Sequence, residues 1–242
     1  MQTFHSQLLN KFPNLTHTFT TIEDGNLAFH VGDDEKSVIY NHQKLAHKLE
    51  YKLQNLVHMR QIHSNIVKII DENDNFNNPP TCDALITDKK DIPLMVMVAD
   101  CSLMLFYDPK KEIIAVAHAG RAGAFNNIIH NLLQTFTEDF HSKKEDIIVS
   151  IGPAICQECY EVGEEVFQEA QDLKLSYALK EKNNRYYLDI RAILYKQLLL
   201  ENIREDKIEI SHNCSKCDKN YYSYRQNIKS GRFCGILSQK NI

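Results

Sequence analysis

Short apolar runs separated by polar turns recur along the chain. They cover residues 66–70, 84–87, 94–99, 103–107, 113–117, 147–151 and 208–212. Several of these runs are apolar at every position, which is typical of strands that are covered on both faces. We therefore predict β-strands at these places, with much of their side-chain surface buried.

Other segments follow the 3.6-residue period of an amphipathic helix. The strongest begins near Phe125 and places apolar residues on one face, at Phe125, Ile128, Ile129, Leu132, Leu133 and Phe136. Asp189 is a candidate N-cap for a second helix, which carries Ile190, Ile193, Leu194 and Leu198 on one side. Weaker patterns lie at 36–49 and 164–173. Because strands and helices interleave irregularly, we predict a single layered α+β domain over residues 1–242.

The composition excludes several classes of protein. Hydrophobic residues make up 43% of the chain and charged residues 25%, so a core can form. The net charge of −4 provides no basic surface for nucleic acid. No apolar run is long enough to span a bilayer, and the N-terminal residues lack the pattern of a signal peptide. We expect a cytoplasmic protein without membrane or nucleic-acid partners.

Two of the predicted strands end in residues that bind metals or do chemistry. The run 94–99 leads into Asp100 and Cys101, and the run 113–117 leads into His118. His63 precedes the run 66–70. Two imidazoles and a thiolate form a three-ligand set suited to zinc, with a fourth position open. A metal-free Cys–His pair acting as nucleophile and base fits the same residues, as do a buried cysteine and hydrogen-bonded histidines.

Further polar residues lie next to this candidate site in the sequence. Gly120 and Gly123 flank Arg121 at a turn that opens the strongest helix, where backbone N–H groups can bind an anion. A tight strand-to-helix turn without a ligand has the same pattern. Arg225 and Arg232 can each bind phosphate through two guanidinium nitrogens at once, or can be surface arginines. Asp83 and Asp100 are candidates for proton transfer or for support of a histidine, and we select Asp100 as the catalytic one.

The chain has seven cysteines, four of which form two Cys-x-x-Cys pairs, Cys156 with Cys159 and Cys214 with Cys217. An odd count without a signal peptide argues against a disulfide framework. The pairs are 55 positions apart (214 − 159), whereas a zinc ribbon joins such pairs by about 15–20 residues. Reduced thiols, some of them in the core, and a long-range site made of four thiolates both remain open.

Ten motifs occur in the order in which one known family has them. They are "QIHS" (61–64), "CDALITD" (82–88), "VADC" (98–101), "HAG" (118–120) with Gly123, "IGPAI" (151–155), "CYEVGEEV" (159–166), "YYLDI" (186–190), "NC" (213–214), "YSYR" (222–225) and "SGR" (230–232). The chain resembles the laccase-domain family, also called multicopper polyphenol oxidoreductases. Its members have been reassigned as zinc-dependent purine nucleoside phosphorylases with adenosine deaminase activity, and some bacterial members are described as peptidoglycan editing factors.

The resemblance implies a fold of mixed β-sheets layered with helices, related to the Cys-His toxin deamidases. It also implies that His63, Cys101 and His118 are the metal ligands. Cys159 and Cys214 match family positions, whereas Cys156 and Cys217 have no assigned role. The chain departs from the family at "HAGRAG" (118–123). Here the family has an aromatic residue after the first glycine, and its basic residue lies one position later.

The resemblance and the residues together favour a zinc enzyme that acts on purine nucleosides and phosphate. Zinc-activated water would deaminate adenosine, and phosphate would cleave adenosine, inosine and methylthioadenosine. The alternatives are an amide hydrolase that edits peptidoglycan precursors, a copper-dependent polyphenol oxidase and a non-enzymatic metal-binding regulator. Copper fits this ligand set less well than zinc, because multicopper oxidation needs many histidine ligands. The oligomeric state stays open.

Overall fold

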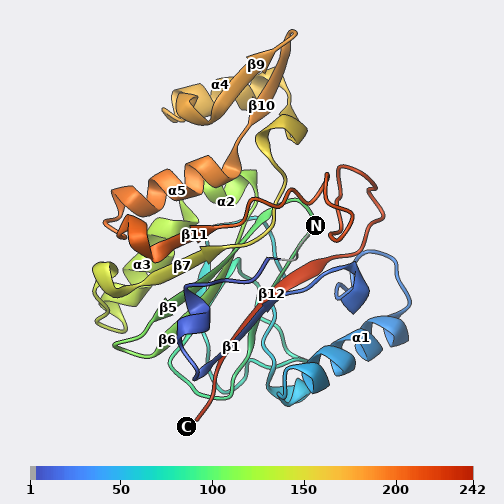
Figure 1. The fold of residues 1–242 in the computed structure, drawn as a ribbon, viewed down its shortest axis with the longest axis vertical. Coiled ribbons are helices and arrows are strands. Elements are labelled where there is room, and N and C mark those ends of the chain that lie inside the picture. Colours follow the sequence, from blue (N-terminus) through green and yellow to red (C-terminus); the bar gives the residue numbers. More distant parts are fainter. Residues whose placement is uncertain (1–3, 242) are drawn as a thin grey trace.

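The computed structural model describes residues 4–241, which form an α+β fold of sheets layered with helices (Figure 1). The α-helices are α1 (Glu35–Lys48), α2 (Arg121–Phe125), α3 (Ile128–Glu138), α4 (Glu164–Asp172) and α5 (Ile190–Leu200). The strands are β1 (Leu15–Phe19), β2 (Val67–Ile69), β3 (Ala84–Thr87), β4 (Leu94–Val98), β5 (Ser102–Asp108), β6 (Ile113–Ala119), β7 (Ile148–Ile151), β8 (Glu161–Val162), β9 (Leu179–Lys182), β10 (Arg185–Leu188), β11 (Ile208–Ile210) and β12 (Phe233–Gln239). The predicted fold class is therefore confirmed.

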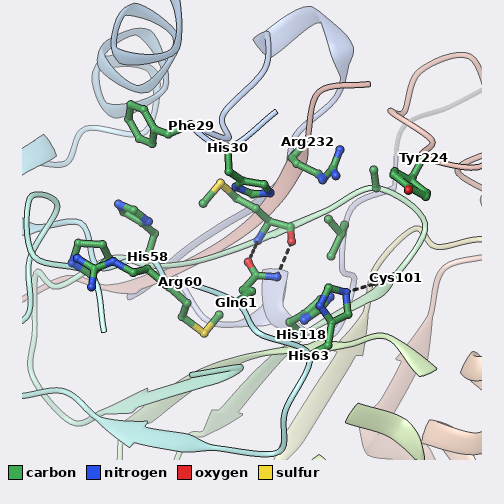
Figure 2. Close-up of a pocket in the computed structure, with 15 residues that line it drawn as sticks. Phe29, His30, His58, Arg60, Gln61, His63, Cys101, His118, Tyr224 and Arg232 are labelled. Carbon is green, nitrogen blue, oxygen red and sulfur yellow. Dashed lines mark hydrogen bonds between the residues drawn. The ribbon is translucent and has the colours of Figure 1, made fainter. Parts of the chain in front are cut away.

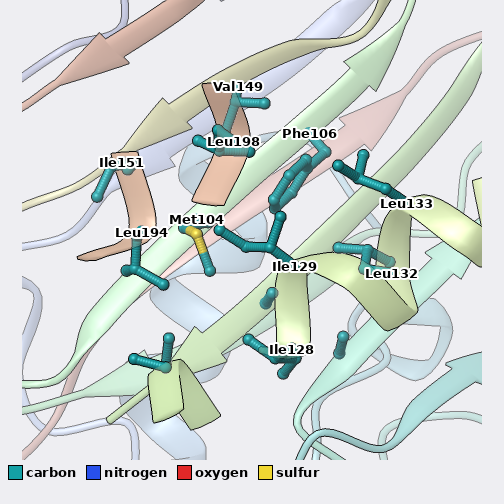
Figure 3. Packing of buried hydrophobic residues seen from close by; sticks show 14 of the residues in the cluster. Met104, Phe106, Ile128, Ile129, Leu132, Leu133, Val149, Ile151, Leu194 and Leu198 are labelled. Atoms are coloured by element: carbon teal, nitrogen blue, oxygen red, sulfur yellow. The ribbon is translucent and has the colours of Figure 1, made fainter. Parts of the chain in front are cut away.

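The central sheet has six strands in the order β11-β7-β5-β6-β3-β2. It is mixed, because β2 pairs with β3 and β11 pairs with β7 in parallel, whereas β5 pairs antiparallel with both β6 and β7. Successive side chains of a strand point to opposite faces of the sheet. Met104 and Phe106 of β5 accordingly pack under α3 and α5, as Figure 3 shows. Leu103, Leu105 and Tyr107 pack on the other face.

A second sheet, with the order β1-β12-β4, covers that other face. Val96 of β4 packs toward the six-stranded sheet, while Met95 and Met97 point outward to a third apolar cluster that includes Leu45 of α1. The layers are thus α3 and α5, the six-stranded sheet, the three-stranded sheet, and α1. This stacking explains the runs without alternation, because the strands of both sheets have an apolar layer on each side.

A small sheet of β8, β10 and β9 protrudes with α4 beyond the layered body (Figure 1). The apolar pattern did not predict these strands, nor β1 and β12. Strand β9 is largely exposed and polar, and β10 (Arg185–Leu188) is four residues long and mostly half-buried, so neither carries an alternating apolar signal. Within residues 4–241, no helix has the length and apolar character required to cross a membrane.

The strongest predicted helix is interrupted, which corrects the expectation of one helix from Phe125. Helix α2 ends at Phe125, and Asn127 adopts a left-handed backbone conformation with φ 52°. Its side chain then accepts a hydrogen bond from the backbone N–H of His130 and starts α3. Asparagine tolerates this conformation better than most residues, so the chain can turn between the two helices. The capping of α5 by Asp189 is as predicted.

Candidate metal centre

Cys101 and His118 come together because β5 and β6 are antiparallel neighbours. Cys101 directly precedes β5, in the crossing from the three-stranded to the six-stranded sheet, and His118 lies near the end of β6. The register pairs Leu103 with His118 and Ser102 with Ala119. The start of one strand therefore lies beside the end of the other.

His63 completes the group from a loop that precedes β2. One ligand atom from each of His63, Cys101 and His118 lies within 4.8 Å of the others, and the Cys101 Sγ to His63 Nε2 distance is 3.9 Å. Both His63 and the neighbouring Asp100 have positive φ values, 59° and 83°. Such backbone conformations are uncommon for residues other than glycine and cluster at functional sites.

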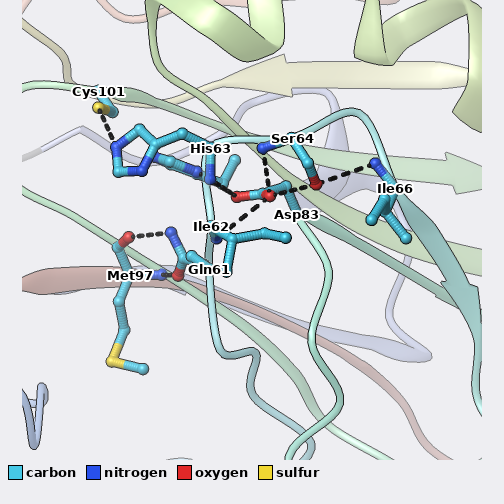
Figure 4. A network of polar contacts seen from close by, with 9 residues as sticks. Gln61, Ile62, His63, Ser64, Ile66, Asp83, Met97 and Cys101 are labelled. Atoms are coloured by element: carbon cyan, nitrogen blue, oxygen red, sulfur yellow. Dashed lines mark hydrogen bonds and ion pairs between the residues drawn. The ribbon is translucent and has the colours of Figure 1, made fainter.

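Asp83 holds the His63 loop in this conformation. Its buried carboxylate accepts hydrogen bonds from three consecutive backbone N–H groups, at 3.3 Å from Ile62, 3.1 Å from His63 and 2.6 Å from Ser64 (Figure 4). The Ser64 hydroxyl donates another at 2.7 Å. Successive N–H groups that point at one carboxylate form an anion-binding nest. Burial would raise the pKa of Asp83, but hydrogen bonds from His118 and Ser64 outweigh it and lower the pKa to about 2.

Asp83 also orients His118. The carboxylate lies 2.8 Å from His118 Nδ1, so that nitrogen carries the proton and Nε2 is left to face Cys101. A carboxylate behind a histidine ligand is a recurrent arrangement in metal sites, since it fixes the ring and makes it more basic. Of the two acidic residues considered from the sequence, Asp83 is therefore the one placed to support a histidine.

The electrostatics of the group favour a cation. Burial would raise the pKa of the Cys101 thiol, but the charge of His118 and hydrogen bonds with both histidines lower it to about 6. Burial would lower the pKa of His118, but Cys101 and Asp83 raise it to about 9. Without a metal, the site is a thiolate–imidazolium pair next to a carboxylate. With a metal, the cation would take the place of the imidazolium proton.

The three residues open into a cavity of about 760 Å³, which is within the range of small-molecule sites. Its walls are mainly apolar and aromatic with a few polar groups: Phe29, His30, His58, Met59, Arg60, Gln61, Pro79, Met97, Val98, Ala99, Tyr224 and Arg232. Figure 2 shows His30 and Arg232 across the cavity from His63 and His118. A ligand of nucleoside size can therefore reach the metal-ligand set from a largely apolar chamber.

The chain is similar to proteins of one known family along most of its length. A family model described as multi-copper polyphenol oxidoreductase laccase matches residues 17–240. The chain belongs to this laccase-domain family. A purine nucleoside phosphorylase of Corynebacterium glutamicum is 33% identical over 213 residues, which is 88% of this chain and 85% of that protein. One of Clostridium acetobutylicum is 32% identical over 225 residues, 92% and 91% of the two chains.

Solved structures of the family have the same fold. The crystal structure of YlmD from Geobacillus stearothermophilus superposes with a TM-score of 0.88 at 26% identity, covering 95% of this chain and 93% of that one. The Bacillus licheniformis protein YfiH gives 0.88 and 26%, with 96% and 94% covered. The three residues that the resemblance implied as metal ligands thus lie together on the fold of the family, and their role as ligands stays a prediction.

Gly120 and Gly123 have a visible packing role in this laccase-domain chain. A Cβ atom on Gly120 would lie 3.0 Å from Cys101 Sγ and 3.0 Å from His63 Cδ2. A Cβ on Gly123 would lie 3.3 Å from the carbonyl oxygen of Ser64. The turn before α2 therefore needs small residues to pack against Cys101 and the His63 loop. Whether its N–H groups also bind an anion stays a prediction.

The arginines proposed for phosphate binding lie in different places. Arg121, where the sequence departs from the family, pairs with Glu169 of α4. Arg225 donates from Nη1 to the carbonyl oxygen of Glu161 at 2.7 Å, with its guanidinium 4.8 Å from the Tyr160 ring centre. Arg232 alone among the three lines the cavity of the metal centre.

Asp100 lies beside Cys101, but its carboxylate is engaged elsewhere. One oxygen accepts from the Ser215 hydroxyl at 2.7 Å and the other from the Arg225 backbone N–H at 2.6 Å. Asp100 is absent from the cavity lining. In this arrangement it anchors the loop that carries Ser215 and Arg225, and the structure does not bring it into the cavity as the catalytic group expected from the sequence.

Several cavity residues were not identified from the sequence. Gln61 exchanges two hydrogen bonds with the backbone of Met97, at 2.8 and 3.0 Å, and so ties the His63 loop to β4. Gln61 belongs to the "QIHS" motif, and its place in that motif was the available signal. Phe29 and His58 carried no such signal, because they reach the cavity only through tertiary packing.

Proposed function

We propose that this protein is a zinc-dependent purine nucleoside phosphorylase that cleaves adenosine, inosine and methylthioadenosine with phosphate and also deaminates adenosine. The observation that carries the proposal is the set of His63, Cys101 and His118 at the wall of a nucleoside-sized cavity. Three protein ligands leave a coordination position for chemistry. The names of the curated relatives support the substrate class.

Zinc fits the donor set better than copper does. Two imidazoles and a thiolate are ordinary zinc ligands, whereas polyphenol oxidation by several coppers requires further histidine-rich centres. Within residues 4–241, the other group of side chains able to hold a metal consists only of cysteines. When bound, zinc would supply Lewis-acid polarisation and a water-derived nucleophile at neutral pH.

The cavity residues would hold the nucleoside and the phosphate. The apolar side chains of Phe29, Met59 and Met97 offer surface for a purine base. Burial, and then the charge of Arg232, lowers the pKa of His30, so its neutral imidazole can accept a hydrogen bond from the ligand. Arg232 can bind a phosphate oxygen while it donates to the carbonyl oxygen of Ser230 at 2.6 Å.

Phosphorolysis then proceeds as a substitution at the sugar. A phosphate oxygen attacks the anomeric carbon of the ribose as the bond to the base breaks. The base leaves with the electron pair and takes up a proton, which gives ribose 1-phosphate and free purine. Deamination instead replaces the amino group of adenosine by oxygen from water and releases ammonia.

The test is product identification with adenosine, inosine and methylthioadenosine, each with and without phosphate. We expect free base and sugar phosphate only when phosphate is present, and inosine from adenosine in its absence. Cys101→Ala should lose both activities together with the metal, because it removes one of three ligands. Unchanged nucleosides under all conditions, with metal bound at His63 and His118, would reject the proposal.

A further inference from the structure

A second group of metal-binding side chains lies outside the centre described above. The sulfur atoms of Cys156, Cys159, Cys214 and Cys217 all lie within 4.8 Å of one another. The distance between the Cys159 and Cys217 sulfurs is 3.3 Å. The two pairs are 55 positions apart in the sequence (214 − 159), so only the tertiary fold brings them together.

The two pairs have the same backbone geometry. The N–H groups of Cys159 and Tyr160 both donate to the carbonyl oxygen of Cys156, at 3.0 and 3.1 Å. In the same way, the N–H groups of Cys217 and Asp218 donate to the carbonyl oxygen of Cys214, at 3.1 and 2.9 Å. Each Cys-x-x-Cys pair therefore folds into one turn that presents two thiols to the same side.

The two turns are also joined to each other. The N–H of Ser215 donates to the carbonyl oxygen of Ala154 at 3.1 Å. The N–H of Cys156 points at the sulfur of Cys214 at 3.3 Å. A backbone N–H directed at sulfur stabilises negative charge on it, as the ligands of a metal–thiolate site require.

The spacing of the sulfurs suits a single tetrahedral ion. Zinc–sulfur bonds of about 2.3 Å place the four sulfurs about 3.8 Å apart. The observed limits, 3.3 Å for one pair and 4.8 Å for the whole group, include this value. A polynuclear iron–sulfur cluster would hold the sulfurs farther apart, because metal and sulfide ions occupy the space between them. Core packing does not explain the group either, since Cys217 is exposed.

We propose that Cys156, Cys159, Cys214 and Cys217 bind one structural zinc ion, distinct from the ion at His63, Cys101 and His118. Four protein ligands close the coordination sphere, which is typical of structural rather than catalytic zinc. On binding, the four thiols would release their protons to solvent, and the resulting thiolates would bind the divalent ion without any change of oxidation state.

This ion would hold together the segments that surround Asp100. The N–H of Ile155, one residue before Cys156, donates to the Asp100 carbonyl oxygen at 2.9 Å. Ser215, one residue after Cys214, donates to the Asp100 carboxylate. Asp100 in turn precedes the ligand Cys101. The four-cysteine site is therefore connected to the candidate metal centre through Asp100. A zinc ion bound there would fix the backbone next to Cys101.

Metal analysis of protein purified without added metal tests the proposal. We expect about two zinc ions per chain, falling to about one in the double variant Cys159→Ser/Cys217→Ser and to about one in Cys101→Ala. Cys234→Ala removes a buried thiol outside both groups and should keep both ions. Equal zinc content in the double variant and the unmodified chain would overturn the proposal.

A cobalt measurement separates this proposal from the proposed function. In the Cys101→Ala background, cobalt should give the strong visible and charge-transfer bands of a tetrathiolate site, and Cys159→Ser/Cys217→Ser should remove them. If the double variant does not fold, titration of Cys101→Ala with a mercurial should release its one remaining zinc as the four thiols react. Iron with inorganic sulfide, or disulfides among these cysteines without metal, would show that the assignment is wrong.

Discussion

At the scale of single residues, Asp83 connects two of the three ligands of the candidate metal centre. Its carboxylate accepts from the backbone of the His63 loop and lies 2.8 Å from His118 Nδ1. The buried carboxylate of Asp83 thus stabilises both the backbone conformation of His63 and the tautomer of His118. Its loss should affect metal binding even though Asp83 itself does not reach the cavity.

We predict that Asp83→Asn weakens zinc binding about 10- to 100-fold, as is common when the partner of a histidine ligand is removed. The amide would present a donor where His118 and three N–H groups need an acceptor. Competition with a chromogenic chelator measures the affinity. Asp108→Asn is the matched control, since Asp108 is also buried and accepts backbone N–H groups, but at the far end of β5. Equal affinities in both variants would contradict this role.

The arginines give a second prediction at this scale. Arg232 lines the cavity, whereas Arg121 pairs with Glu169. A charge-assisted hydrogen bond contributes roughly 1.5–3 kcal/mol, so Arg232→Ala should raise the phosphate KM about 10- to 150-fold. Arg121→Ala should change it little, and Arg225→Ala tests the third candidate. Initial rates at varied phosphate measure the effect. A phosphate-specific loss confined to Arg121→Ala would reverse the assignment.

At the scale of elements, the turn from β6 into α2 closes one side of the metal centre. Gly120 is the N-cap of α2 and approaches both Cys101 and His63. The close packing depends on the antiparallel register of β5 and β6, which brings the start of one strand to the end of the other. A Cβ atom at Gly120 would require Cys101 or His63 to shift by a few tenths of an ångström.

We therefore predict that Gly120→Ala lowers metal affinity more than Gly123→Ala does. The first Cβ would lie 3.0 Å from a ligand sulfur, whereas the second would meet backbone carbonyl oxygens at 3.3 and 3.4 Å. Gly120 is the N-cap of α2, where glycine is better than alanine, whereas Gly123 lies inside the helix, where alanine is better. Metal titration and thermal unfolding of both variants distinguish a local displacement from a general loss of stability. A larger metal defect in Gly123→Ala would refute the argument.

At the scale of the whole molecule, one wall of the cavity continues into the packing between α1 and the three-stranded sheet. The buried His42 of α1 stacks on Phe29, with ring centres 5.5 Å apart and planes 7° apart. Its Nε2 lies 2.9 Å from the Leu27 carbonyl oxygen. Burial lowers the pKa of His42 from 6.5 to about 4. Protonation of the His42 ring is therefore unfavourable while α1 stays packed on the three-stranded sheet.

We predict that His42 makes the protein less stable as the pH falls from about 6.5 toward 4. Because the folded-state pKa is lowered, the unfolded chain takes up the proton first and unfolding becomes easier in that window. The contribution is on the order of 3 kcal/mol at most. Urea unfolding at several pH values should show a flatter profile for His42→Gln than for the exposed control His47→Gln. Parallel profiles would exclude His42 as the cause.

Local patterns in the sequence were sufficient for the central strands, the α+β class and the capped helix α5. Apolar runs, helical periodicity and caps depend only on residues close together in the sequence, so they can be recognised without knowledge of the rest of the chain. The ordered motifs indicated the family. His63, Cys101 and His118 could be grouped because each is a metal-binding residue next to the end of a predicted strand. The residues alone left a metal site and a metal-free Cys–His pair equally open.

Tertiary structure decided what depends on contacts between distant segments. It joined β1 to β12, selected Asp83 rather than Asp100 as the support of a histidine, and placed Arg232 but not Arg121 at the cavity. It also gathered four cysteines whose spacing fits no short zinc motif. Strand pairing, side-chain direction and the meeting of distant loops are set by the packing of layers. Packing depends on the whole fold, and no local window of the sequence contains it.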